Sequence, residues 1–239
     1  MGRAEDAPAR PVGFPVPGWT PPPRPPRAPL EGRYARVEPL DPERHAADLF
    51  AANRLDDAIW TYMPYGPFDT LDAYRAWIEG AGLGDDPLFH AVIDRETGKA
   101  AGVAAYLRID PPAGAIEVGH ICYSPALQRS RAGTEAMVLL MRRAFGLGYR
   151  RYEWKCDALN AASRRLAQRL GLSHEGVFRQ ATVYKGRNRD TAWYAAIDRE
   201  WPALEAAFET WLDPANFDAA GRQRRSLSEL TRPILVATG

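Results

Sequence analysis

The stretch AIEVGHICYSPALQRSRAGTEA, residues 115–136, is the part of the chain that decides the fold. Its first nine residues predict a strand over 115–123, which ends at Ser124-Pro125. Apolar residues at helical spacing then predict a helix over 131–145, and the glycines at 146 and 148 end it. The sequence therefore predicts a strand, a short loop and a helix in direct succession.

The loop between this strand and this helix has properties that suit a phosphate group. The first backbone amides of a helix have no partners within the helix, and the helix dipole adds partial positive charge there. Arg129 and Arg131 add charge beside these amides. Phosphate oxygens suit such a place, and an ordinary strand-to-helix connection is the alternative interpretation. The loop is neither a P-loop nor a dinucleotide-binding fingerprint, because it lacks the Gly-Lys-Ser/Thr and G-x-G-x-x-G patterns.

Working outward, the flanking sequence predicts further strands and helices. Asp41-Pro42 is typical of a helix start, an N-cap followed by proline, and Thr70-Leu71-Asp72 opens a second helix. Turn residues at 95–99 and 185–188 each predict a hairpin. The other predicted strands span 33–38, 89–93, 101–109, 152–156, 177–184 and 191–197, and the other helices 160–170 and 200–212. Three antiparallel strands followed by strand–helix–strand indicate a mixed sheet with helices on both faces.

The composition is that of an ordinary globular chain. Apolar residues make up 46% and charged residues 26% of 239 residues, and the formal net charge is +1. This balance gives no indication of nucleic-acid binding. No run reaches the roughly 18 apolar residues of a membrane span, and no signal peptide is evident. Cys122 and Cys156 are expected to be free buried thiols. We therefore expect a soluble, cytoplasmic protein with no nucleic-acid or membrane partner.

The chain divides into three parts. Residues 1–30 form a proline-rich leader, because the run TPPPRPPR over 20–27 excludes both helix and central strand. We expect an extended arm that lies on the domain, anchored by Phe14 and Trp19, or is left disordered; a recognition segment for a partner's aromatic groove is the alternative. Residues 31–212 form the folded domain. Residues 213–239 form a polar, basic C-terminal tail for which we predict no order.

Three motifs, in this order, resemble the pattern of the GNAT superfamily of N-acetyltransferases. Gln128-Arg-Ser-Arg-Ala-Gly133 is similar to the acetyl-CoA signature Gln/Arg-x-x-Gly-x-Gly/Ala. The run from Asn160 through Ser163 to Leu170-Gly-Leu172 is similar to Asn-x-x-Ser-x-x-x-x-x-x-Leu-Gly-Phe. The segments beginning at Glu175 and at Asp190 resemble the closing strands of the RimL/RimJ-like branch, which acetylates ribosomal proteins. The resemblance covers about residues 31–212.

This resemblance implies a fold, a reaction and a co-substrate. The implied GNAT fold is α/β (α+β), with a mixed and mostly antiparallel central sheet of about seven strands and helices on both faces. The implied reaction is direct transfer of the acetyl group of acetyl-CoA to a primary amine on a protein N-terminus, a lysine or a small molecule, with no metal. A homodimer is possible, since relatives often dimerise. The implied cofactor-binding residues are Ile121, Cys122, Tyr123, Gln128, Arg129, Ser130, Arg131, Ala132, Gly133, Thr134, Asn160 and Ser163.

Arg131 departs from the family pattern. It stands where the family has a glycine that lets the backbone approach the pyrophosphate. An arginine there puts that approach in doubt, although its side chain could pair with a phosphate instead. A second departure is Ala167, at the position where many members carry a tyrosine general acid, although RimL-like members often lack that tyrosine.

Glu117 is the candidate catalytic residue, because a strand glutamate at this spacing is the general base in histone-acetylating relatives. It would take a proton from the acceptor ammonium, and apolar neighbours would have to raise its pKa. A sheet glutamate paired with an arginine is the alternative. Regular alternation places Tyr123 on the face of Glu117 and His120 on the opposite face, so we expect His120 to be a packing or surface residue. Cys122 as an acyl-enzyme nucleophile is a weaker hypothesis.

The acceptor is expected among acids and aromatics that precede the second helix. Acidic and aromatic side chains suit an amine, although packing is an alternative role for the cluster. The candidate substrate-binding residues are Asp56, Trp60, Tyr62 and Tyr65. Two other functions stay open: a non-catalytic CoA-binding module, and an interaction protein that uses the proline-rich leader.

Overall fold

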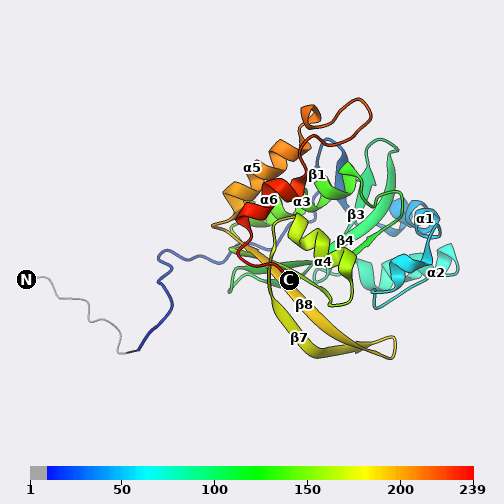
Figure 1. Ribbon diagram of the computed structural model, residues 1–239. Coiled ribbons are helices and arrows are strands. Elements are labelled where there is room, and N and C mark those ends of the chain that lie inside the picture. The colour runs from blue at the N-terminus through cyan, green and yellow to red at the C-terminus, as the bar shows by residue number, and fades with distance from the viewer. Residues whose placement is uncertain (1–9) are drawn as a thin grey trace, which may run out of the picture.

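An eight-stranded sheet forms the centre of the computed structural model, which describes residues 10–239 (Figure 1). The strand order is β1-β2-β3-β4-β5-β6-β8-β7, and among these strands β5 and β6 form the single parallel pair. The strands are β1 (Leu30–Glu31), β2 (Ala35–Pro39), β3 (Leu88–Asp94), β4 (Lys99–Asp110), β5 (Ala115–Tyr123), β6 (Arg151–Asp157), β7 (Ser173–Tyr184) and β8 (Arg187–Ile197). The predicted mixed, mostly antiparallel sheet is confirmed.

Six α-helices cover the two faces of this sheet. They are α1 (Pro42–Asn53), α2 (Leu71–Trp77), α3 (Arg131–Gly146), α4 (Ala161–Arg169), α5 (Trp201–Leu212) and α6 (Leu227–Thr231), and a short 3-10 helix, η1 (Asp57–Trp60), precedes α2. The predicted helix starts are confirmed. Asp41 accepts a hydrogen bond from the backbone N–H of Arg44 at 2.9 Å, and Thr70 accepts one from Ala73 at 3.1 Å.

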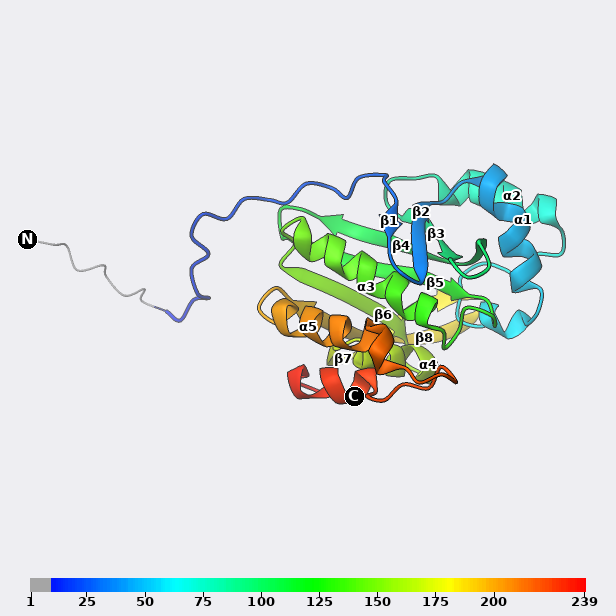
Figure 2. The same cartoon turned by 90° about the horizontal axis from the view of Figure 1, so that it is seen from above.

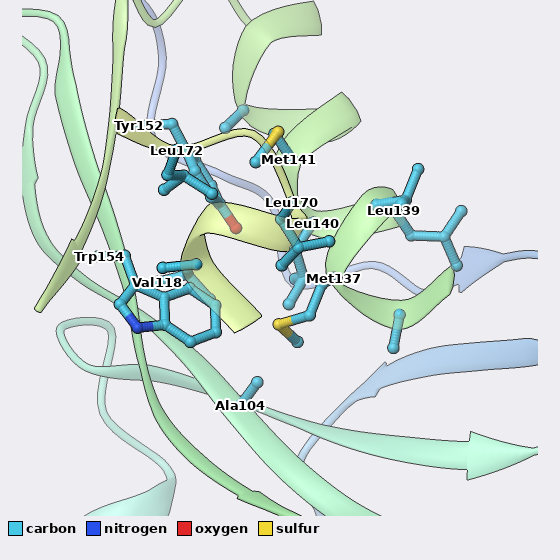
Figure 3. Packing of buried hydrophobic residues seen from close by; sticks show 14 of the residues in the cluster. Ala104, Val118, Met137, Leu139, Leu140, Met141, Tyr152, Trp154, Leu170 and Leu172 are labelled. Carbon is cyan, nitrogen blue, oxygen red and sulfur yellow. The ribbon is translucent and has the colours of Figure 1, made fainter. Parts of the chain in front are cut away.

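Alternating residues of β4 separate two hydrophobic cores. Ala104 and Tyr106 point into the larger core, between the sheet and α3, whereas Val103 and Ala105 point into the smaller core beneath α1 and α2. Figure 3 shows part of the larger core, where side chains of α3 meet Trp154 of β6. Burying each large apolar side chain contributes about 1.5–3 kcal/mol, so this core fixes α3 on the sheet.

Strand β5 contains a bulge that changes which face its side chains occupy. Ile116 and Val118 pack in the larger core, whereas Cys122 packs in the smaller one. Regular alternation would put all three on one face. The register with β4 shifts after Gly119, and His120 has a positive φ of 50°. The bulge therefore exchanges the two faces of the strand beyond this point.

Because of the bulge, two side chains of β5 lie on the faces opposite to those that regular alternation predicted. His120 lies on the face of Glu117, where its ring packs 5.0 Å from the ring of Phe89. Tyr123 lies on the opposite face, where its hydroxyl donates to the carbonyl of Gly133 at 3.1 Å. An extra residue in a strand reverses the alternation after it, and the sequence pattern alone does not reveal where it sits.

Strands β5 and β6 part beyond the bulge. They pair only from Ala115 opposite Arg151 to Val118 opposite Trp154, although β5 continues to Tyr123. The gap opens where α3 and α4 begin, because the starts of both helices line the same pocket as Ile121 and Tyr123 of β5. A parallel pair that separates in this way leaves backbone groups free to face a ligand.

The leader is extended along the domain from residue 10 onward, while residues 1–9 of the predicted leader lie outside the described residues. Trp19 donates to the carbonyl of Pro112 at 3.2 Å, as expected for an anchor. Arg143 of α3 donates to the carbonyls of Pro26, Ala28 and Pro29. The described part of the leader is therefore an arm held by the domain.

The C-terminal residues, which we expected to form a tail beyond the domain, pack against it instead. Leu227 of α6 is fully buried in the larger core, and Thr231 donates to the carbonyl of Arg169 at 3.1 Å. The chain end passes β7, where Ser173 accepts from the backbone of Val236 at 3.0 Å. Figure 2 shows α6 beside α5 on the outside of the molecule. Residues 213–239 thus belong to the domain.

Candidate functional site

A large pocket opens where β5 and β6 part and where α3 and α4 begin. Its volume is about 1710 Å³, more than the roughly 300–1,000 Å³ of a site for a drug-sized ligand, so it suits a longer molecule. Residues from the C-terminal segment form one wall, including Phe217, Gln223 and Arg232. All twelve predicted cofactor-binding residues line it: Ile121, Cys122, Tyr123, Gln128, Arg129, Ser130, Arg131, Ala132, Gly133, Thr134, Asn160 and Ser163.

The loop before α3 presents three backbone N–H groups that donate to nothing in residues 10–239. They belong to Arg129, Arg131 and Ala132. The neighbouring amide of Gly133 is capped by the hydroxyl of Ser130 at 2.8 Å. Arg129 adopts a positive φ of 58°, which turns the loop ahead of the helix. Free amides at the positive end of a sixteen-residue helix suit an anion, so the geometry is compatible with the phosphate interpretation of this loop.

Arg131 does not block this site. Its guanidinium stacks 4.9 Å from the ring centre of Tyr34 and 4.7 Å from that of Phe217. These cation–π contacts hold the side chain against the two rings, while its backbone N–H stays free at the helix start. The departure from the family pattern therefore leaves the amide cradle intact.

Gly133 is required by packing. A Cβ at this position would lie 2.7 Å from the carbonyl oxygen of Leu127 and 3.1 Å from the ring of Tyr123. No real Cβ tolerates the first distance, so a glycine is needed for the helix to start this close to the loop.

The N-terminus of α4 forms the opposite wall of the pocket. Asn160 caps the helix by accepting from the backbone N–H of Ser163 at 3.0 Å. The hydroxyl of Ser163 accepts from the indole N–H of Trp154 at 2.9 Å. Both side chains are fixed by these bonds and both border the gap between the strands.

Glu117 is buried among cations. Its carboxylate accepts two hydrogen bonds from Arg108, at 2.7 and 3.1 Å, and forms an ion pair with Lys155 at 2.8 Å. The apolar surroundings that we expected are therefore replaced by charge pairing, which joins β4, β5 and β6. Its role as a general base stays a prediction, and these contacts argue for the alternative of a paired sheet glutamate.

The four predicted acceptor residues have different environments. Asp56 and Tyr62 line the pocket, and Tyr62 donates to the carbonyl of Leu159 at 3.2 Å. Trp60 is only 4% exposed and packs against other aromatic rings, so its side chain belongs to the smaller core and not to the pocket surface. Tyr65 lies over His120, with the two rings stacked 5.7 Å apart.

His120 is the residue of this region that sequence reasoning assigned to packing. Its Nδ1 is 3.2 Å from the hydroxyl of Tyr65, and its ring is partly exposed. Burial first, and then the charges of Arg108 and Arg189, lower the pKa of His120 to about 4, so its imidazole is neutral at pH 7.

Other chemistry is limited in the part of the chain that the structure describes. Burial raises the pKa of the Cys122 thiol to about 12, which leaves it protonated and unreactive. Within residues 10–239, no three His, Cys, Asp or Glu side chains gather as a metal site would need. No helix of that range has the length and apolarity to cross a membrane.

The comparisons with known proteins agree with this geometry. A family model described as "Acetyltransferase (GNAT) domain" matches residues 36–173, more than half of the chain. The chain belongs to the GNAT acetyltransferase family. The predicted family is thereby confirmed, and acetyl-CoA as the acetyl donor follows from it. A search of curated proteins finds no match.

Two solved GNAT structures are similar over most of the chain. A GCN5-related N-acetyltransferase from Brucella melitensis is 48% identical, with a TM-score of 0.89, over 91% of this chain and all of that one. A probable GNAT acetyltransferase from Chromobacterium violaceum is 42% identical, with a TM-score of 0.76, over 82% of this chain and all of that one. Both similarities cover more of the chain than residues 36–173, which the family model matches.

More distant structures share the fold alone. A putative ribosomal-protein-serine acetyltransferase from Vibrio cholerae is 19% identical with a TM-score of 0.62, over 71% of this chain and 97% of that one. The acetyltransferase MccE, solved with acetyl-CoA and AMP, is 20% identical with a TM-score of 0.62, over 70% of this chain and 93% of that one.

Proposed function

We propose that this protein transfers the acetyl group of acetyl-CoA to a primary amine by direct attack of the amine on the thioester. The observation that carries the proposal is the pocket at the parted strands, which ends at three free amides of Arg129, Arg131 and Ala132. A diphosphate fits these amides and the helix dipole behind them. A long, narrow arm fits the gap between β5 and α4.

With the diphosphate at these amides, acetyl-CoA would make its other contacts along β5 and α4. The backbone of Ile121, Cys122 and Tyr123 would run beside the pantetheine arm, and Asn160 and Ser163 would face it from α4. An N–H of the parted strand near Ile121 would polarise the thioester carbonyl, as an oxyanion hole does. Gln128, whose side chain donates to the carbonyl of Tyr123 at 2.9 Å, would hold the loop in shape.

The acceptor would enter beneath η1 and α2. Asp56 and Tyr62 supply a carboxylate and a hydroxyl at the pocket, and both suit an amine. Since one fold relative is described as a ribosomal-protein-serine acetyltransferase, a peptide N-terminus is the acceptor that we propose to test first, in keeping with the RimL-like branch. A cytoplasmic location and a homodimer belong to the same proposal.

Thermal unfolding with and without acetyl-CoA tests the cofactor, with ATP and NAD as controls. Ligand at about a hundred times its dissociation constant stabilises by roughly 2.7 kcal/mol. For a chain of this size that is a rise in Tm of about 5–11 °C. A rise with acetyl-CoA alone supports the proposal, and equal shifts with all three ligands, or none, contradict it.

Release of free CoA then tests turnover. The acceptor panel comprises hexapeptides beginning with serine or alanine, N-acetyl-lysine methylamide, spermidine and tyramine. Acetyl-CoA binding without CoA release on any acceptor would favour a non-catalytic CoA-binding module. Release that depends on one class of acceptor supports the enzyme and identifies that class.

A further inference from the structure

The bulge in β5 delivers one imidazole to the side of the parted strands opposite the cofactor pocket. His120 directly precedes Ile121, which lines the pocket, but the ring of His120 packs against Tyr65, which precedes α2, and against Phe89 of β3. An acceptor that enters beneath η1 and α2 would therefore meet this ring as it approaches the thioester. A regular strand would have turned the ring into the larger core.

The ring of His120 is held by two residues, Tyr65 and Phe89. Tyr65 stacks on it with an interplanar angle of 11°, and Phe89 packs against it at 5.0 Å. The hydroxyl of Tyr65 fixes Nδ1, while Nε2 makes no hydrogen bond to any of residues 10–239. Burial raises the pKa of Tyr65 well above its usual range, so its hydroxyl stays neutral and can either donate to Nδ1 or accept the Nδ1–H. The base role requires the second arrangement, which leaves the Nε2 lone pair open.

The carboxylate of Glu117, the other candidate for the general base, already has charged partners. Both oxygens of Glu117 accept from Arg108, and one of them also contacts Lys155. Side-chain exposure is 3% for Glu117 and 5% for Lys155, so water does not reach the pair readily. Taking a proton would break this buried pair, which is costly, and would leave Lys155 with Glu153, 2.9 Å away, as its remaining carboxylate partner.

We propose that His120 is the general base, with Tyr65 as the positioning residue that fixes its tautomer; this inference rests on the proposed function. The neutral amine nitrogen attacks the thioester carbonyl carbon, the C–N bond forms, and the C–S bond breaks with its electron pair leaving on sulfur. The surplus proton on nitrogen passes to Nε2 of His120. The imidazolium then returns a proton to the CoA thiolate, directly or through water, so the base is regenerated.

The electrostatics of the site set the protonation state of His120. Burial and the charges of Arg108 and Arg189 lower its pKa to about 4, so the imidazole is neutral at pH 7 and is a weaker proton acceptor than an ordinary imidazole. The groups that act on it are Tyr65 and Phe89, which pack against the ring, and the charged Arg108 and Arg189. A strongly disfavoured imidazolium also gives its proton up quickly, which suits return to a thiolate.

The first test reads the tautomer and does not depend on turnover. Long-range ¹H–¹⁵N NMR of the histidine-labelled protein, with His120 assigned by comparison with H120Q, should show a neutral ring protonated on Nδ1 at pH 7. In Y65F the ring should lose this single tautomer. An imidazolium, or a ring protonated on Nε2, overturns the proposal whether or not an acceptor has been found.

The second test uses the acceptor that the wild type acetylates best in the CoA-release panel. H120A and H120Q should lose about 10²–10⁴-fold in kcat/KM. Their rise in Tm with acetyl-CoA should match the wild type, which separates failure of this inference from failure of the proposed function. Added imidazole should restore H120A, and more basic substituted imidazoles should restore it further.

Three results would overturn the base role. One is kcat/KM within about fivefold of wild type in H120A. Another is a kcat/KM of H120Q close to that of the wild type, because glutamine can hydrogen-bond to Tyr65 but cannot carry the proton. The third is a loss in H120A that imidazole does not restore at any concentration. E117Q is the matched control: it should lower the Tm through its lost ion pairs, and imidazole should not change its rate.

Discussion

Arg131 and Gly133 lie two residues apart in the same loop motif, but the structure constrains them for different reasons. The side chain of Arg131 stacks on Tyr34 and Phe217, which line the pocket with it, and its backbone N–H donates to nothing in residues 10–239. R131G should therefore bind acetyl-CoA within about threefold of wild type. It should lose roughly 1–2 kcal/mol of stability, from two cation–π contacts and a more flexible helix start. Calorimetric titration and thermal unfolding measure both, and a tenfold weaker Kd would show that the side chain contacts a phosphate.

G133A provides the opposite case. The added Cβ would meet the carbonyl oxygen of Leu127 at 2.7 Å, so the loop or the helix start must move. We expect a loss of about 1–3 kcal/mol in stability, typical of overpacking, and at least tenfold weaker binding of acetyl-CoA, because the amide cradle is displaced. The same two measurements apply. An unchanged Kd in G133A would mean that the cradle does not hold the diphosphate.

The buried His90 should make the free energy of unfolding depend on pH. It is fully buried beside Tyr106, and neither ring nitrogen has a hydrogen-bond partner in the described chain. Burial first, and then the charge of Arg143, lower its pKa to about 4, from about 6.5 in the unfolded chain. Below pH 6.5 the unfolded state binds a proton that the folded state refuses, so stability falls as pH drops to about 4 and then levels off.

The variant H90M removes this proton and nearly preserves the volume of the side chain. The wild type should lose about 3 kcal/mol from this one group between pH 7.5 and pH 4. The difference in unfolding free energy between H90M and wild type should grow by that amount over the same range. Urea unfolding at several pH values measures it, and parallel curves for the two proteins would show that His90 is already charged or solvated in the fold.

At the scale of elements, the sequence predicts what depends on local pattern. The caps Asp41 and Thr70 lie where the helices start, and both hairpins form where turn residues predict them. The bulge at His120 was missed because alternation assumes a regular strand, and no residue type uniquely marks an inserted position. The ion pair of Glu117 with Lys155 was missed because it joins two strands that the sequence does not align.

Helix α6 was missed for another reason. It has only five residues, too few for helical periodicity, and it lies in a polar segment. A signal was nevertheless present: Ser226 and Glu229 form a capping box, in which each side chain accepts from the backbone of the other. A capping box followed by a single buried leucine is enough to dock a short helix when the domain offers a site.

Leu227 tests whether α6 is part of the core. Its side chain is fully buried, so L227A should cost about 2–4 kcal/mol and lower the Tm by roughly 5–15 °C. V236A is the matched control, because Val236 is 79% exposed and its backbone bond to Ser173 survives the change. Thermal unfolding of both variants decides the matter. A shift of less than about 2 °C in L227A would mean that the C-terminal segment detaches freely.

At the scale of the whole molecule, the leader ties together parts that are far apart in the sequence. Arg143 of α3 binds three of its carbonyls, Arg27 pairs with Asp85 before β3, and Trp19 packs on the turn that joins β4 and β5. None of these contacts lies in the pocket, whose walls come from residue 33 onward. The leader should therefore affect stability and leave cofactor binding unchanged.

Shortening the chain separates these two effects. A protein that starts at Pro29 loses the buried Pro22 and Pro25, and it leaves the guanidinium of Arg143 with only the carbonyl of Pro29 as a partner in the leader. We expect about 2–4 kcal/mol less stability and a Tm lower by roughly 5–15 °C, because apolar burial and two of the three charge-assisted bonds of Arg143 are lost. A protein that starts at Gly18 keeps all of these contacts and should stay within about 2 °C of the full chain. Acetyl-CoA should bind both with the Kd of the full chain. Weaker binding in the shorter protein alone would mean that the leader shapes the site through α3, whose N-terminus carries the amides and whose C-terminal half the leader holds.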